Sequence, residues 1–235
     1  MRHDDAPHLN GRRAARPVRR SPSPRRGRAA VPSASGQKKP AEPANSQRDR
    51  IRQTAATLFV RRGYQVTSMK QLATALGMVP ANLYNYYPSK QAILFDVLDA
   101  QLTKFIARQS AIVDGGRDPV ETLRGLAYDL VMEDLQDPFA ATLTHHALEW
   151  LTGRARKQIR QHLVRVREMW LDTVRKGQKA GRFHISRPNL ATLTILTLCS
   201  FVSNWFDPAG QLSAHEVADY TAAAVLRCVG HVAPG

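Results

Sequence analysis

Residues 67–90 read TSMKQLATALGMVPANLYNYYPSK, and this stretch predicts two short helices joined by a turn. The apolar side chains of the first helix recur at helical spacing and are those of Met69, Leu72, Ala73 and Leu76. Ser68 and Gln71 have the spacing of a capping box, with Thr67 as an alternative first cap. Gly77 can end this helix because glycine accepts a positive φ without steric cost.

Pro80 suits the first turn of a second helix, because its missing N–H would have no partner there. This helix, over about residues 80–86, is expected to bury mainly Leu83. Its other side chains are small, polar or amphipathic and are expected to point outward. Two short helices around a glycine turn, the second with a polar outer face, predict a helix-turn-helix.

The same stretch closely resembles the DNA-binding domain of TetR-family transcriptional regulators, over about residues 50–98. The resemblance is carried by Thr67-Ser68-Met69, Leu72-Ala73, Gly77, Leu83-Tyr84 and Tyr87-Pro88-Ser89-Lys90. Asn85-Tyr86 departs from the family's frequent His-His or His-Tyr, which leaves the sequence specificity open. The alternative reading is three helices that pack for stability only.

Carried over position by position, the resemblance implies three groups of DNA contacts. Thr67 or Ser68 would donate to a phosphate. The residues facing base edges would be Lys70, Val79, Pro80, Ala81, Asn82 and Asn85. The DNA backbone would be held by Tyr84, Tyr86 and Lys90. Since base contacts set sequence choice and phosphate contacts set affinity, the two heads of a dimer would read a near-palindromic double-stranded operator.

Residues 1–44 differ in composition from the rest of the chain. They hold 11 Lys/Arg against 3 Asp/Glu and seven of the 14 prolines, and they show no apolar periodicity. This basic extension is expected to be disordered and to attract phosphates weakly, or to be only a solvated extension. It lacks the apolar segment of a secretory signal, and no apolar run has the length of a membrane span. A cytoplasmic protein is therefore expected.

The remaining 191 residues predict an all-α fold, a three-helix helix-turn-helix head followed by six helices. The head would cover residues 45–92, with a first helix capped near Asn45 or Ser46, and Val66 is expected in its core. The ligand-binding and dimerisation domain would cover residues 93–235. Its last two helices, over residues 189–206 and 213–229, carry apolar stripes, and the resemblance implies that they pair in a homodimer.

The turn at residues 204–213, NWFDPAGQLS, follows the Gly-x-Phe of residues 181–183 and resembles regulators of fatty-acid or steroid breakdown that bind acyl-CoA thioesters. A tight turn with aromatic rings packed beneath it is the alternative reading. The effector would be an acyl-CoA or another hydrophobic small molecule held in an apolar cavity. The candidate ligand-binding residues are Phe139, Leu143, His146, Trp150, Met169, Trp170, Arg182 and Trp205. Leu130, Leu148 and Leu163 are further candidates for the cavity wall.

No metal site or cofactor is predicted. His145, His146 and Glu149 share a helical face, but they lack a clear fourth ligand. Cys199 and Cys228 lack metal or redox spacing and are expected to be buried thiols. Because the sequence has no nucleophile elbow, phosphate loop or carboxylate pair, it predicts a ligand-responsive regulator, most simply a repressor, and not an enzyme. Two alternatives are an enzyme with an accessory DNA-binding head and a nonspecific architectural DNA-binding protein.

Overall fold

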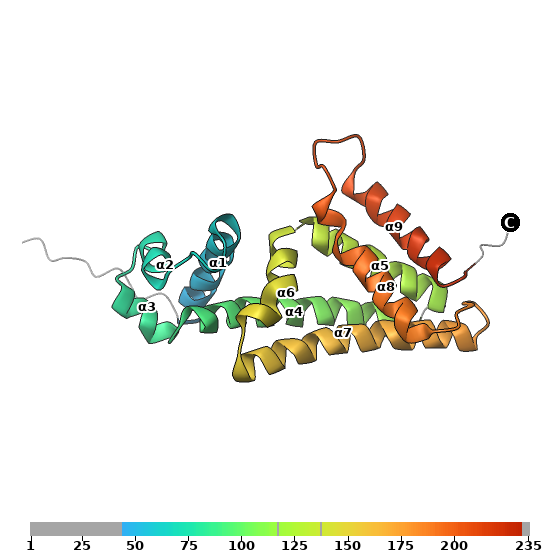
Figure 1. Ribbon diagram of the computed structural model, residues 1–235, viewed down its shortest axis with the longest axis horizontal. Helices are drawn as coiled ribbons and strands as arrows, with labels where there is room; N and C mark the ends of the chain where they lie inside the picture. Colours follow the sequence, from blue (N-terminus) through green and yellow to red (C-terminus); the bar gives the residue numbers. More distant parts are fainter. Residues whose placement is uncertain (1–43, 117, 137, 232–235) are drawn as a thin grey trace, which may run out of the picture. The chain divides into compact units, whose positions relative to one another are not determined.

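The computed structural model describes residues 44–116, 118–136 and 138–231, which lie within one compact unit. Apart from Ala44, the predicted disordered extension lies outside these residues. The described part is all-α, as predicted, and contains nine α-helices and no strand (Figure 1). The head consists of α1 (Ala44–Arg62), α2 (Met69–Ala75) and α3 (Pro80–Tyr86). Within the described residues, no helix is both long enough and apolar enough to cross a membrane.

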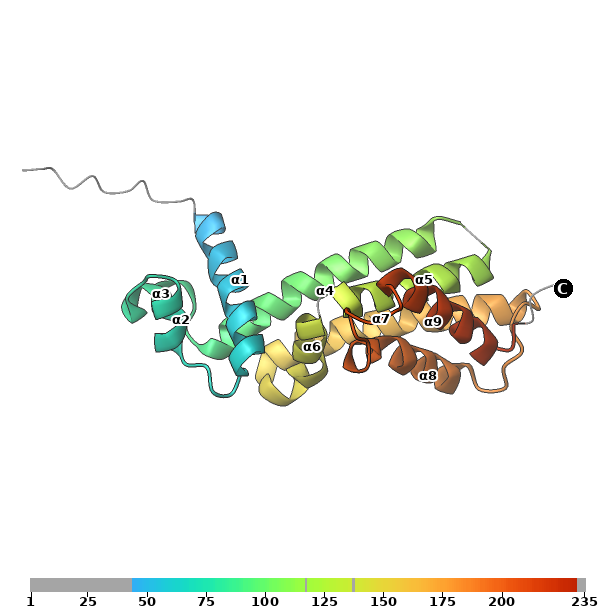
Figure 2. The ribbon, with the colours of Figure 1, turned by 90° about the horizontal axis from the view of Figure 1, so that it is seen from above.

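Six helices and one short 3-10 turn follow the head. They are α4 (Lys90–Asp114), α5 (Pro119–Gln136), α6 (Pro138–Trp150), α7 (Gly153–Lys179), α8 (Pro188–Ser200), η1 (Val202–Asn204) and α9 (Ala214–Cys228). The long helices α4 and α7 run side by side, and α5 packs against α9 (Figures 1 and 2). α6 lies between the head and this rear bundle and contacts α1, α4, α5 and α7.

The local signals of the head are confirmed. Ser68 caps α2 and forms a capping box with Gln71. Gly77 has φ +66°, Pro80 occupies the first turn of α3, and Leu83 is fully buried. α1, α2 and α3 therefore pack around a small apolar core that also includes the start of α4.

Two details of the head prediction are wrong. α1 begins at Ala44, so Asn45 and Ser46 lie inside its first turn and not ahead of it. Val66 is 69% exposed and does not enter the core. Tyr64 of the same loop is buried and packs edge-on against Phe59.

α4 connects the two apolar cores of the unit. Ser89 caps its first turn by accepting a hydrogen bond from the Ala92 N–H. Its buried face begins with Ile93 and Leu94 in the head core and continues to Phe105 in the rear core. A single rigid helix thus belongs to both parts, so a displacement of either part acts on the other.

The predicted helix over residues 189–206 is wrong at its C-terminal end. α8 ends at Ser200, and η1 follows. The Ser203 N–H donates to Asp134 Oδ2 on α5 at 2.8 Å, so it is not available for a helical bond to the carbonyl four residues earlier. In the single chain, Leu190, Leu193 and Leu198 of α8 are 42–56% exposed.

The hydroxyl groups of α8 are satisfied within the helix itself. Thr192, Thr194, Thr197 and Ser200 each donate to the carbonyl four residues earlier, at 2.8–3.0 Å. Thr194 and Thr197 do so on the exposed side. Together with the exposed leucines, they give α8 a largely apolar outer face.

Candidate DNA-binding surface and ligand cavity

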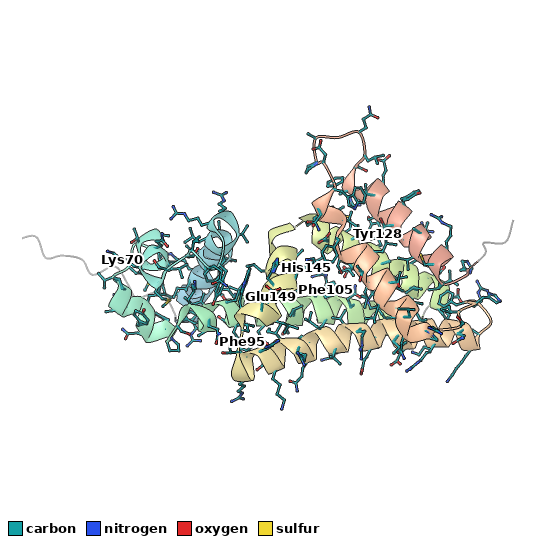
Figure 3. The ribbon with its side chains drawn as sticks, viewed as in Figure 1. Lys70, Phe95, Phe105, Tyr128, His145 and Glu149 are labelled. Carbon is teal, nitrogen blue, oxygen red and sulfur yellow. The ribbon has the colours of Figure 1, made fainter. Side chains whose placement is uncertain are left out.

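The outer face of α3 is open to solvent. Val79 is 60% exposed and Tyr84 is 51% exposed, while Leu83 anchors the helix from below. The other predicted base-reading residues, Lys70, Pro80, Ala81, Asn82 and Asn85, are also exposed. Figure 3 shows Lys70 on the head, and Tyr86 is partly buried. Among the predicted residues that lie on α3, only Tyr86 is partly covered, so this helix presents a polar and aromatic surface.

Thr67 is one of the two residues predicted to donate to a phosphate. Its side chain is buried, and its hydroxyl donates to the Gly63 carbonyl at 2.8 Å. The hydroxyl therefore has no proton left for a phosphate and instead ties together the loop between α1 and α2. Ser68 is exposed and is the remaining candidate of the pair.

Lys90 also differs from its prediction as a free backbone contact. Its Nζ donates to the carbonyls of Tyr64 at 2.7 Å and Gln65 at 3.1 Å. The same nitrogen lies 4.3 Å from the centroid of the Tyr64 ring, a cation–π contact, and burial lowers the pKa of Lys90. Two of its three protons are thus used to hold the α1–α2 loop on α4.

A cavity of about 350 Å³ lies in the rear bundle, where α4, α5, α6, α7 and α8 meet. Most of its wall is apolar, formed by Leu102, Phe105, Leu130, Ala141, Leu148, Leu163, Val166 and Leu196. Its polar lining consists of Gln101, Glu133, Asp134, Thr144, His145 and Ser200. Figure 3 shows Phe105 and His145 on two of the helices that bound it. A mostly apolar wall with a few polar groups is typical of a small-molecule site.

Comparisons with known proteins agree with this architecture. Residues 51–97 match the family described as "Bacterial regulatory proteins, tetR family", and residues 116–229 match "Tetracyclin repressor-like, C-terminal domain". This chain belongs to the TetR family.

Two curated relatives of this TetR-family regulator carry the same description, HTH-type transcriptional repressor KstR2. The protein from Mycobacterium tuberculosis is 29% identical over 195 residues, which cover 77% of this chain and 92% of that protein. The protein from Mycolicibacterium smegmatis is 28% identical over 201 residues, covering 80% and 92%. The solved structure of the ketosteroid transcriptional regulator KstR2 of Mycobacterium tuberculosis is 25% identical, covers 81% of this chain and 97% of that chain, and has a TM-score of 0.72.

Within this TetR-family fold, seven of the eight residues predicted to bind the ligand do not line the cavity, and the side chain of the eighth, Phe139, is outside the described part of the chain. Leu143 and Trp150 face the head, where they border a smaller hollow beside Tyr64. Trp170 is fully buried in the rear core and donates to Gln109 at 2.8 Å. Met169 packs against the same core and accepts a hydrogen bond from Ser110. All four are packing residues.

The other members of that set lie elsewhere or outside the described side chains. His146 stacks on Trp150 and contacts Glu149 at 3.2 Å, on an exposed face. Arg182 forms an exposed ion pair with Asp118 at 3.5 Å. Trp205 is 63% exposed, and the side chain of Phe139 lies outside the described residues.

Other residues that the sequence suggested for the wall of this cavity do lie there. Leu130, Leu148 and Leu163, which the sequence also suggested, do line it. Asp134 and His145 were missed as ligand candidates. The sequence signal that could have identified Asp134 is its position as an acidic residue in an otherwise apolar face of α5, because a buried carboxylate requires a partner.

Neither the cysteines nor the histidines form a further site in the described part of the chain. No group of three His, Cys, Asp or Glu residues there has the arrangement needed to hold a metal ion. Cys199 is buried, and burial raises the pKa of its thiol, whereas Cys228 is exposed, contrary to the prediction. The Gly-x-Phe signature has a packing role, because Phe183 lies against Gly177, where a Cβ would be only 2.1 Å from its ring.

Proposed function

We propose that this TetR-family regulator is a homodimeric repressor that leaves a near-palindromic operator when an apolar small molecule occupies the rear cavity. One observation carries the proposal. α6 supplies Ala141, Thr144, His145 and Leu148 to the cavity wall, and it ends at Trp150, whose ring stacks on Tyr64 of the head. The same helix therefore contacts both the ligand site and the DNA-binding head.

A second link joins α6 to the start of α4. The Gln91 side chain donates to the Trp150 carbonyl at 3.0 Å and accepts from the Thr152 hydroxyl at 3.2 Å. Since α3 leads directly into α4, a shift of α6 on ligand binding would change the orientation of the head. A ligand that binds one orientation more tightly shifts the population toward it, and operator affinity changes with it.

Operator recognition would depend on the exposed side of α3. Asn82 and Asn85 would read adenine, and Val79 or Ala81 a thymine methyl. The phosphate-binding role moves from Thr67 and Lys90 to Ser68, Tyr84 and Tyr86, because the first two are engaged in internal hydrogen bonds. Lys70 is assigned to a phosphate and not to a base edge, because it lies on α2, the helix of the motif that crosses the DNA backbone. Two heads about 34–36 Å apart would fit successive major grooves.

Dimerisation is supported by the outer apolar face of α8 and its neighbours. Large apolar side chains are exposed there, namely Leu190, Leu193, Leu198, Phe201, Trp205 and Tyr220. The three leucines lie close together along α8, and exposed apolar side chains that cluster on a protein surface mark an interaction site. A two-fold pairing through this face gives the two-headed arrangement that a near-palindrome requires.

The relatives favour an acyl-CoA or steroid-derived effector. They are named KstR2, and the solved one is described as a ketosteroid regulator. The mostly apolar cavity fits an acyl or fused-ring group, and exposed arginines on α7, such as Arg160 and Arg165, provide positive charge for the CoA phosphates.

A combined binding and release experiment tests the proposal. Acyl-CoA thioesters, the matching free acids and drug-like cations are screened by thermal shift, and each stabilising compound is then added to the operator complex. Stabilisation with operator release is expected from the same compound. Asn82→Ala should relax sequence choice, while Lys70→Ala should lower affinity for all sequences. A compound that stabilises the protein without affecting DNA binding would contradict the regulatory role of the cavity.

A further inference from the structure

The polar end of the cavity contains a buried carboxylate with one unpaired oxygen. Asp134 is 2% exposed, and its Oδ2 accepts the Ser203 N–H at 2.8 Å. Its Oδ1 is shielded from solvent and is the one buried side-chain atom in the described part of the chain without a hydrogen-bond partner. Burial is unfavourable for the charged form and raises the pKa of Asp134, and the hydrogen bonds from Ser203 and the nearby His145 oppose only part of this rise. A ligand that brings a donor to Oδ1 would remove this cost.

His145 on α6 lines the same cavity. Its ring stacks on Phe201 with the centroids 4.3 Å apart, and burial lowers its pKa, which favours the neutral imidazole. A neutral imidazole offers one N–H donor and one acceptor nitrogen. Thus His145 can complete the hydrogen bonding of a group that also donates to Asp134.

The charge of the lining argues against an anionic group at this end. The second carboxylate, Glu133, already accepts from Arg108 Nη2 at 2.6 Å. None of the described residues that line the cavity is a lysine or arginine. A ligand carboxylate placed beside Asp134 would therefore meet a like charge, and the one titratable base among the described lining residues is His145, whose pKa is lowered by burial.

We propose that the cavity selects an apolar ligand whose buried end carries a neutral hydrogen-bond donor, such as a hydroxyl, and that the Asp134 carboxylate turns toward the cavity so that Oδ1 accepts that donor. The inference rests on the proposed function only in taking this cavity as the effector site. For an acyl-CoA, it means that a hydroxylated acyl chain binds better than the matching keto chain. Ligands that end in a carboxylate are disfavoured at this end.

The test uses three probes of equal chain length, 1-decanol, 2-decanone and decanoic acid. Their binding to the full chain is measured by calorimetry in the absence of DNA. We expect 1-decanol to bind about tenfold more tightly than 2-decanone, because only the alcohol can donate to the carboxylate, and decanoate to bind more weakly than both. Equal affinities for the alcohol and the ketone, or no binding of any probe, would overturn the proposal.

Asp134→Asn should reverse this preference. The amide oxygen can still accept the Ser203 N–H, while the amide nitrogen now donates where Oδ1 accepted, which favours 2-decanone over 1-decanol. Asp129→Asn is the matched control, since Asp129 is on the same helix and pairs with Arg108 and not with the cavity. It should leave the alcohol-to-ketone ratio unchanged, and a ratio that stays the same in Asp134→Asn would contradict the assignment.

The outcomes separate this inference from the proposed function. If the parent protein discriminates between the probes but no cavity ligand releases the operator, the effector role fails and the donor selectivity stands. If a ligand releases the operator while the alcohol and ketone bind equally, only the donor selectivity fails. If Asp134→Asn does not fold, the relative affinity of the parent protein for 1-decanol and 2-decanone is enough to test the inference.

Discussion

The rings of Tyr64 and Trp150 stack with their centroids 5.0 Å apart and their planes at 22°. Tyr64 belongs to the loop between α1 and α2, and Trp150 is the last residue of α6. Lys90 lies against the same tyrosine ring, at 4.3 Å from its centroid. The Tyr64 side chain of the head thus contacts both α4, through Lys90, and α6, which lines the cavity.

Trp150→Ala should weaken communication between the cavity and the head. The substitution removes the stacked ring, so ligand binding should change operator affinity by only a few fold, where an intact coupling of about 1–3 kcal/mol gives 5–150-fold. Operator titrations by fluorescence anisotropy, with and without the effector found by thermal shift, measure this ratio. Trp150→Phe keeps a stacking ring and serves as the control. Full induction in Trp150→Ala would show that the stack carries no coupling.

Lys90→Met should lower stability without changing the salt dependence of DNA binding. The methionine cannot donate to the carbonyls of Tyr64 and Gln65, and the loss should cost about 1–3 kcal/mol in the free energy of unfolding. Urea unfolding and the slope of log affinity against log salt are the two measurements. Lys70→Met, at an exposed position, should show the opposite pattern, with a slope reduced by about 1 and unchanged stability. A reduced slope in Lys90→Met would restore its role as a phosphate contact.

The head could be predicted closely because its signals are local. A capping residue, its partner three positions later, a glycine with positive φ and a proline in the first turn each act within a few residues. Ser68, Gly77 and Pro80 consequently lie where the sequence placed them. Val66 was misplaced because it lies in the loop between α1 and α2, where helical spacing does not indicate which side chains face the core.

The cavity could not be predicted to the same extent, because five helices form it. Periodicity shows that α6 and α7 have apolar faces, but it does not show which part of a face meets the head, the core or an unfilled space. Leu143 and Trp170 fill cores, whereas Leu148 and Leu163 border the cavity. The end of α8 was missed for a similar reason, because Asp134, 69 residues away in sequence, binds the Ser203 N–H.

Leu193→Glu should convert the protein to monomers. Leu193 is 49% exposed on α8, and a charge there would be desolvated without a partner in the proposed dimer. Sedimentation or light scattering should show half the parent mass, and operator affinity should fall because only one head binds at a time. Val164→Glu, which alters a 39% exposed valine on α7, is the control and should remain dimeric. A dimeric Leu193→Glu protein would place the interface elsewhere.

Asp134→Asn should stabilise the protein at neutral pH. Because burial raises the pKa of Asp134 in the folded state, folding is favoured most below the unfolded pKa of 3.8, and this contribution is lost as the pH rises through the folded value. The asparagine variant has no such loss, so it should exceed the parent in the free energy of unfolding by about 1 kcal/mol at pH 7 and converge with it toward pH 4. Urea unfolding between pH 4 and pH 8 measures the difference, and a constant difference would exclude titration of Asp134 as its cause.

The hydroxyls of α8 have a consequence for the choice of partner. Thr194 and Thr197 already donate to carbonyls of their own helix, so a protein that covers this face does not need to supply acceptors for those protons. Recognition of a partner by this face would then depend on how well the partner packs against its leucines and aromatic rings, with few hydrogen bonds between the two. Such a surface would distinguish dimer partners by shape complementarity alone. A related chain whose surface has the same shape would therefore form mixed dimers with this one.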